Sequence, residues 1–204
     1  MISREERALG RELLFSAAVF AGGASTRMGT DKAFLPFGGD LLIERQLRCL
    51  QEAGAAEVLI SGRVGTDYSR FGLTVVHDER PDCGPLAGVA AILKAATLEK
   101  TLVLAVDMPG ITPAMLRKIV LCGDELGCVP VDDRGFEPLA AAYSKQILPL
   151  AEELLAVGRY SMQEFVKEAK ERGLVRTLQI EPEERLHFIN CNRQSDWADF
   201  INER

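Results

Sequence analysis

Residues 20–32, Phe-Ala-Gly-Gly-Ala-Ser-Thr-Arg-Met-Gly-Thr-Asp-Lys, place glycines, hydroxyl groups and two cations in one short stretch. Glycine lets the backbone approach a ligand closely, and successive free N–H groups of such a loop can surround an anion. Arg27 and Lys32 add cationic donors that suit phosphate oxygens. The stretch therefore predicts a loop that holds a nucleoside triphosphate. In the plainer alternative, the glycines only shape a tight turn and the two cations are solvated.

The spacing of this loop differs from two common phosphate-binding motifs. A P-loop needs Gly-Lys-Thr where this chain has Met28-Gly29-Thr30. A dinucleotide fingerprint needs G-x-G-x-x-G, whereas Gly22 and Gly23 are adjacent. The loop is thus a triphosphate-binding candidate of another kind.

Asp107 is the second candidate for chemistry. It follows the five apolar residues 102–106 and precedes Met-Pro-Gly. A carboxylate at the end of a buried strand is well placed to hold magnesium, which typically takes one or two carboxylates together with substrate phosphates. The alternative role is that of a helix cap or a turn residue.

A third signal is Gly84-Pro85-Leu86, which opens a helix. The first N–H groups of a helix are free to meet an anion, although Pro85 itself has none. Simple helix initiation would explain an isolated Gly-Pro equally well. Asp78, by local sequence alone, is a turn residue.

Alternating strand-like and helix-like segments must position these residues. Expected strands are 15–21, 58–60, 73–76, 102–106, 128–131, 138–143 and 175–180, and expected helices are 41–53, 86–97, 113–121, 146–155, 162–170 and 195–201. This order predicts an α/β fold of three layers, Rossmann-like, with a mostly parallel central sheet. Ligands of such sheets bind beyond the carboxyl ends of the strands, where the loop after Ala21, Ser61, Asp78 and Asp107 all fall.

Composition narrows the class of protein. The chain has 204 residues, 47% of them apolar, with a net charge of −6 and no dense basic block, which argues against a nucleic-acid partner. No apolar run approaches the ~20 residues of a membrane span. Five cysteines are dispersed and form no C-x-x-C pair, which favours a reducing compartment and a cytoplasmic location. We expect one domain over 1–204, with 1–14 as an N-terminal extension.

Residues 21–32 match the pattern A-G-G-x-S-x-R-M-G-x-D-K, and the chain resembles the molybdenum cofactor guanylyltransferases, within the nucleotidyltransferases of the sugar-phosphate type. Further segments that resemble this family are 84–88 (G-P-L-A-G), 137–143 (E-P-L-A-A-A-Y) and 188–192 (F-I-N-C-N). The resemblance covers about 15–200. One departure is Ser61, where the family often has Asn for contact with the guanine nucleotide.

The resemblance implies roles for particular residues. Arg27, Lys32 and Asp107 would be catalytic, and Asp107 would also bind Mg²⁺. Asn190 and Asn192, which an extended segment points to one face, would contact the pterin; the alternative is that they form a turn. The implied nucleotide-binding set is Phe20, Ala21, Gly22, Gly23, Arg27, Lys32, Ser61, Asp78, Gly84, Pro85, Leu86 and Asp107.

The activity that the resemblance implies is transfer of GMP from GTP to the terminal phosphate of molybdopterin or the molybdenum cofactor, with release of pyrophosphate. Expected partners are these substrates, other proteins of cofactor biosynthesis and the recipient molybdoenzymes. Two alternatives stay open: a cytidylyltransferase or sugar-phosphate nucleotidyltransferase, and a non-catalytic GTP-binding module that delivers the cofactor.

Overall fold

The computed structural model describes residues 14–22, 32–78, 80 and 82–191. Their strands are β1 (Ser16–Phe20), β4 (Glu57–Ser61), β5 (Thr74–Val76), β6 (Lys100–Ala105), β7 (Gly127–Asp132), β8 (Gly135–Phe136), β9 (Ala140–Ser144) and β10 (Val175–Gln179). Within these residues they form an eight-stranded sheet in the order β10-β7-β9-β6-β1-β4-β5, with β8 paired to β7. β9 runs antiparallel between β6 and β7, and β8 runs antiparallel to β7, whereas the other pairs are parallel. The predicted mostly parallel sheet is confirmed.

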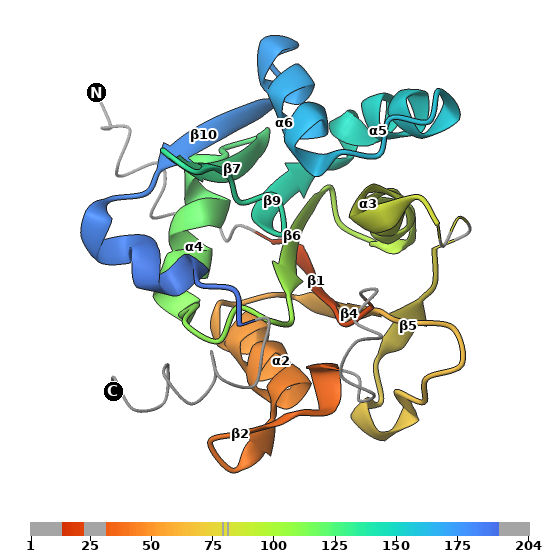
Figure 1. Ribbon diagram of the computed structural model, residues 1–204, viewed down its shortest axis with the longest axis vertical. Helices are drawn as coiled ribbons and strands as arrows, with labels where there is room; N and C mark the ends of the chain where they lie inside the picture. Colours follow the sequence, from red (N-terminus) through yellow and green to blue (C-terminus); the bar gives the residue numbers. More distant parts are fainter. Residues whose placement is uncertain (1–13, 23–31, 79, 81, 192–204) are drawn as a thin grey trace.

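Helices cover both faces of the sheet, which gives the three layers (Figure 1). One face carries α2 (Leu42–Glu52) and α4 (Pro113–Cys122), and the other carries α3 (Gly84–Ala95), α5 (Leu148–Ala156) and α6 (Met162–Glu171). The described residues form two hydrophobic cores, one between the sheet and each helical layer. None of the helices in the described part of the chain has the length and apolar character needed to cross a membrane.

The position of strand β6 in the sheet explains the run of apolar residues in its sequence. Every residue of the strand is buried. Leu102 and Leu104 belong to the core under α2 and α4, whereas Val103 belongs to the core under α3. A central strand with helices on both faces of its sheet needs apolar residues at consecutive positions.

The ends of the three central strands lie level. Phe20 of β1 pairs with Ser61 of β4 on one side and with Ala105 of β6 on the other. The loops that follow these strands therefore leave the same edge of the sheet. This common register brings the loop after Ala21 and the segment that contains Asp107 to one place, as predicted.

Several elements differ from the expectations. The helix expected at 146–155 is divided into a 3₁₀ turn, η4 (Lys145–Ile147), and α5. The hairpin of β2 (Pro36–Phe37) and β3 (Asp40–Leu41) and the 3₁₀ helices η2 (Lys32–Phe34), η3 (Ser69–Phe71) and η5 (Pro182–Phe188) were not predicted. They are too short to show a hydrophobic period. The helix expected at 195–201 lies outside the described residues.

Candidate active site

Lys32 and Asp107 meet at the carboxyl edge of the sheet, although they are 75 residues apart in the chain. Lys32 opens η2, and Asp107 stands two residues beyond β6. The Lys32 Nζ atom donates to Asp107 Oδ2 at 3.3 Å, and the two side chains are 13% and 22% exposed. Both are thus sheltered but open to a ligand, which is what a phosphate site requires.

The main chain holds the start of the glycine-rich loop. The N–H groups of Ala21 and Gly22 both donate to the carbonyl oxygen of Ser61, at 3.0 and 3.2 Å. The N–H of Val106 donates to the carbonyl of Phe20 at 3.1 Å. Residues 23–31, which include Gly23 and Arg27, lie outside the described residues, so their predicted roles stay predictions.

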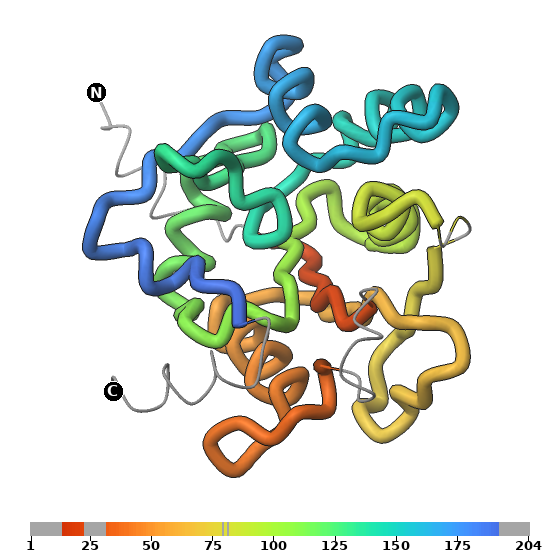
Figure 2. The backbone as a smooth tube through the Cα atoms, viewed as in Figure 1, coloured from red at the N-terminus to blue at the C-terminus, as the bar shows by residue number. Residues whose placement is uncertain are grey.

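The segment that carries Asp107 is fixed from two directions. Gln46, fully buried on α2, donates from Nε2 to the carbonyls of Met108 (2.8 Å) and Val106 (3.3 Å). The N–H of Cys191 donates to the carbonyl of Asp107 at 2.9 Å. Figure 2 shows the C-terminal part of the described chain returning beside this segment. Sequence reasoning missed Gln46, although an amide among the apolar positions of a helix face is a detectable signal.

The return of the C-terminal segment also places Asn190. It directly precedes Cys191 and is exposed at the same edge of the sheet. Nearby, His187 Nδ1 and the Gly110 carbonyl are 2.8 Å apart. Asn192 lies outside the described residues. The structure thus brings one of the two predicted pterin residues next to Asp107.

The other predicted nucleotide residues divide into two groups. Phe20 and Leu86 bury their side chains in the core under α3, so only their main chains can face a ligand. Gly84 and Pro85, at the start of α3, are exposed. The Asp78 Oδ1 atom is buried and, among the described residues, has no hydrogen-bond partner. An unpaired buried acceptor needs a donor, which a bound ligand can supply.

Helix α3 approaches the nucleotide-binding strands closely. A Cβ atom on Gly88 would lie 2.9 Å from Cε1 of Phe20 and 3.3 Å from Oγ of Ser61. Ser61 is only 8% exposed, so its hydroxyl lies against the helix. Its carbonyl, which binds Ala21 and Gly22, is its clearest link to the loop.

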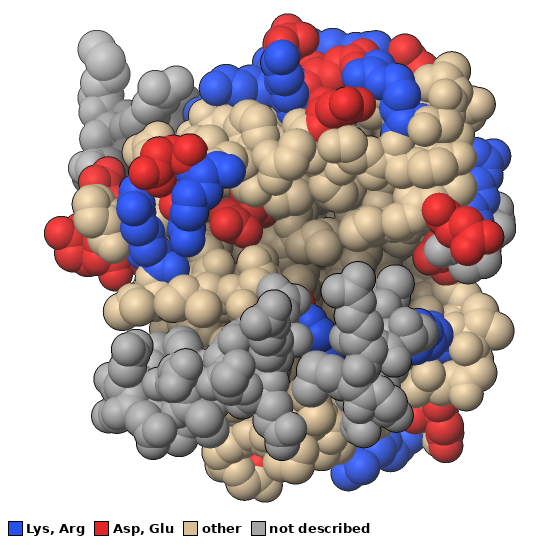
Figure 3. Space-filling view, viewed as in Figure 1, with Lys and Arg blue, Asp and Glu red and all other residues tan. Residues whose placement is uncertain are grey.

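A charged cluster stands at the end of β7, on the far side of β6 from β1. The Asp132 side chain is only 1% exposed. Its carboxylate accepts a hydrogen bond from Arg134 Nε at 2.9 Å and lies 3.8 Å from Arg185 Nε. Hydrogen bonding from Arg134 holds the pKa of Asp132 below its usual range. Figure 3 shows side chains of both charges around a hollow on this face of the molecule. We call β1, β4, β5 and β6 with their loops the nucleotide half, and β7–β10 with η5 the acceptor half.

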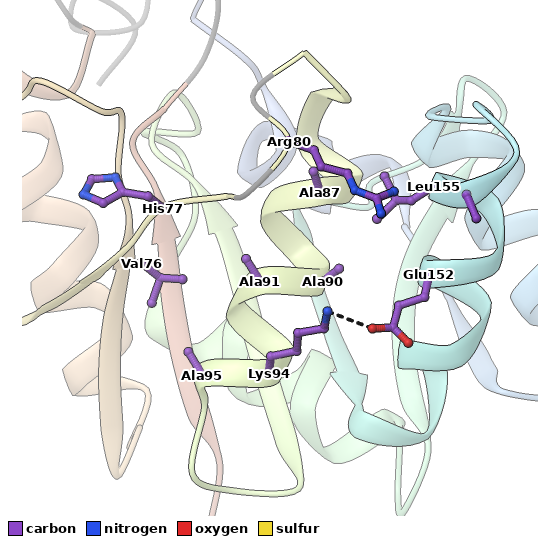
Figure 4. Close-up of a pocket in the computed structure, with 11 residues that line it drawn as sticks. Val76, His77, Arg80, Ala87, Ala90, Ala91, Lys94, Ala95, Glu152 and Leu155 are labelled. Atoms are coloured by element: carbon purple, nitrogen blue, oxygen red, sulfur yellow. Dashed lines mark ion pairs between the residues drawn. The ribbon is translucent and has the colours of Figure 1, made fainter.

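A cavity of about 540 Å³ lies elsewhere, along the outer face of α3 between β5 and α5. Its floor is formed by alanines of α3, and Lys94 and Glu152 are joined across it at 2.7 Å (Figure 4). Neither Lys32 nor Asp107 lines it. The cavity therefore belongs to a helix surface and not to the candidate active site.

The donor set at Asp107 suits a metal that is bound mainly by a substrate. Among the described residues there is no cluster of three or more His, Cys, Asp or Glu that could hold a metal by itself. Magnesium needs no such cluster, because phosphate oxygens and water complete its shell. One partly exposed carboxylate at the phosphate-binding edge fits that requirement.

Comparison with known proteins now gives the family. Residues 17–173 match the model of the MobA-like NTP transferase domain. The chain belongs to this family. It is 43% identical over 187 residues to a probable molybdenum cofactor guanylyltransferase of Opitutus terrae, covering 89% of this chain and 92% of that one. It is 34% identical to the molybdenum cofactor guanylyltransferase of Xanthomonas euvesicatoria, covering 93% and 95%.

Solved structures agree on the fold of this MobA-like transferase. The molybdopterin-guanine dinucleotide biosynthesis protein A of Archaeoglobus fulgidus superposes with a TM-score of 0.72 at 22% identity, covering 92% of this chain and 97% of that one. The nucleotidyltransferase fold expected from the sequence is confirmed.

Proposed function

We propose that this MobA-like transferase moves GMP from GTP to the terminal phosphate of molybdopterin or the molybdenum cofactor and releases pyrophosphate. The meeting of Lys32 and Asp107 at the level ends of β1 and β6 carries the proposal. The names of the relatives, at 43% and 34% identity over most of the chain, support this substrate pair.

The proposed reaction needs little proton transfer by the protein. A phosphate monoester has its second pKa near 6, so at neutral pH it is already an anionic nucleophile. Its oxygen attacks the α-phosphorus of GTP, the bond to the β-phosphate oxygen breaks, and pyrophosphate leaves with the bonding electron pair. Alignment and charge neutralisation are then the main contributions of the site. Lys32 supplies positive charge to the triphosphate, and in the family pattern Arg27 does the same.

We further propose that Asp107 binds magnesium together with phosphate oxygens. The bound cation would neutralise phosphate charge. Asp107→Asn keeps the size of the side chain and removes the charge, so activity should fall strongly and recover in part at high magnesium concentration. Wild-type activity at limiting magnesium would show that Asp107 has no metal role.

Competition among nucleotides tests the proposal as a whole. The protein, magnesium and molybdopterin are incubated with equal GTP, CTP and ATP, and the products are resolved by mass. GTP should be preferred, because ATP reverses the hydrogen-bond pattern of the guanine edge and leaves buried polar groups unpaired, at about 1 to 3 kcal/mol for each. Equal transfer from CTP would favour a cytidylyltransferase, and no transfer at all would favour a delivery module.

None of the five cysteines forms a disulfide bond in the described part of the chain, in keeping with the reducing compartment expected from their spacing. We propose that the protein acts in the cytoplasm. Partners among other biosynthesis proteins and recipient molybdoenzymes are part of the same proposal.

A further inference from the structure

Glu137 lies in the short segment between strands β8 and β9, in the acceptor half. Its N–H donates to the carbonyl of Pro130 on β7 at 2.9 Å. Two residues later the carbonyl of Leu139 accepts from the N–H of Ala105, the last residue of β6, at 2.6 Å. Glu137 is therefore bound to β7 and stands two residues before the contact with β6, the strand that leads to Asp107.

The Glu137 carboxylate is half-buried and unpaired. Within the described part of the chain its side chain forms no ion pair or hydrogen bond. The two arginines of the neighbouring cluster each bind an aspartate, Arg134 Nε to Asp132 at 2.9 Å and Arg185 to Asp133 at 2.7 Å, while the buried Arg185 Nε forms no hydrogen bond among the described residues. A carboxylate that is ionised can only accept hydrogen bonds, and no described side chain or main-chain N–H donates one to that of Glu137.

The surroundings raise the pKa of Glu137 to about 7, chiefly through burial. Asp132 raises it further, and Arg134 acts in the opposite direction. This agrees with the geometry: the carboxylate has lost part of its hydration, and the nearby guanidinium has not replaced it.

We propose that Glu137 accepts a pair of adjacent N–H groups from the heterocyclic ring of the acceptor, and so determines which ring the acceptor half admits. The inference deepens the proposed function and rests on it. An amino group beside a ring N–H, as on the pyrimidine ring of a pterin, presents two nearly parallel donors to the two oxygens of one carboxylate. The acceptor's phosphate would be repelled by Glu137 and belongs beside Lys32.

Binding of two ring probes to the full-length protein tests this. The probes are 6-hydroxymethylpterin and 6-hydroxymethyllumazine, which differ in that the second has an oxygen in place of the amino group. The wild-type protein should bind the pterin at least about tenfold more tightly, the factor expected for a hydrogen bond to a charged group. Equal binding of the two rings, or binding of neither, overturns the inference.

Glu137→Gln supplies the matched protein variant. A carboxamide offers one acceptor and one donor, so the pterin preference should fall to about twofold or less, or reverse. Asp133→Asn is the control, because it removes one negative charge from the same corner at an exposed position, and it should keep the preference. A Glu137→Gln protein that keeps the wild-type preference overturns the inference.

Turnover gives a second readout. The KM for molybdopterin should fall as pH rises through about 7 in the wild type, because only the ionised carboxylate accepts both N–H groups. The same profile in Glu137→Gln should lack this change, and the KM for GTP should stay within about twofold of wild type. A KM that rises with pH would show instead a protonated Glu137 donating to the phosphate. Failure of the proposed function differs from all of these outcomes, since it would appear as no GMP transfer by the wild type.

Discussion

The two halves of the sheet are built by different means. In the nucleotide half, parallel strands end level and the main chain holds the loops, as when Ala21 and Gly22 both bind the carbonyl of Ser61. In the acceptor half, an antiparallel strand interrupts the sheet, and side chains from distant segments hold the edge, as when Arg185 approaches Asp132. The nucleotide half therefore depends on backbone register, whereas the acceptor half depends on which side chains meet.

This difference suits the two substrates. Phosphates are bound well by backbone N–H groups and cations, which many sequences can place through a short motif. A ring is recognised by its edge, which needs individual side chains at fixed points. The four changes below test the contrast, from the largest expected effect to the smallest.

Among the four changes, Lys32→Ala should have the largest effect on GTP affinity and turnover. In the proposed function the ammonium group neutralises triphosphate charge both in the bound state and in the transition state, so GTP affinity and turnover should fall together. The loss in kcat/KM for GTP should be about 2 to 4 kcal/mol, the scale for one preorganised donor to developing charge. Lys94→Ala is the control, because Lys94 also forms an ion pair but lies outside the cleft. Values within twofold of wild type would remove Lys32 from the site.

Gly110→Ala should disrupt the contact between the two halves. A Cβ atom there would collide with the carbonyl oxygen of Leu186 in η5, so one of the two segments must move. We expect a loss of about 2 to 3 kcal/mol in the free energy of unfolding, measured in urea. The KM for the acceptor should also rise. Leu186→Ala, which trims an exposed side chain and keeps the carbonyl, should be nearly neutral. Equal effects of the two changes would contradict a main-chain contact.

Gln46→Leu should loosen the Asp107 segment with little change in volume. Two carbonyls, those of Val106 and Met108, would lose their buried donor. The expected cost is about 2 kcal/mol in the free energy of unfolding, with a fall in kcat. Arg48→Ala on the exposed face of the same helix should change neither quantity. If kcat were unchanged while stability fell, Gln46 would support the fold without positioning Asp107.

Glu137→Gln should stabilise the ligand-free protein at high pH. The folded pKa of about 7 lies above the unfolded value near 4.3, so folding favours the protonated form. In the wild type this contribution is fully present below about pH 4 and is lost as pH rises to about 7. Above pH 7 the variant should be more stable by about 1 kcal/mol, after allowance for partial exposure, and the difference should vanish near pH 4.

Urea titrations at pH 4 and pH 8 measure this difference. Asp133→Asn, at an exposed neighbouring position, should show no comparable gain at pH 8. A Glu137→Gln protein that is less stable than wild type at pH 8 would show that the carboxylate has a partner in the fold. A more stable protein would show that the acceptor half keeps an unpaired acceptor at the expense of stability.

Much of the nucleotide half was predictable from the sequence. The run that ends at Ala21 and the apolar residues before Asp107 are local patterns, and the structure has them as strands β1 and β6. Strands β1, β4 and β6 run parallel, and their carboxyl ends lie at the same level. Lys32 and Asp107 could be expected at one edge of the sheet because parallel strands present their carboxyl ends together.

The sequence by itself determined the alternation of strands and helices, the three layers and the edge of the sheet at which Lys32 and Asp107 meet, since each depends on local propensity and hydrophobic period. Only the tertiary structure decided that β9 runs antiparallel, that Gln46 holds the Asp107 segment and that the arginines of the acceptor half leave Glu137 unpaired. The contacts of Gln46 and Arg185 join residues far apart in the chain, and a single side chain has no periodic signal. Their partners are fixed by how the layers pack, which no short stretch of sequence specifies.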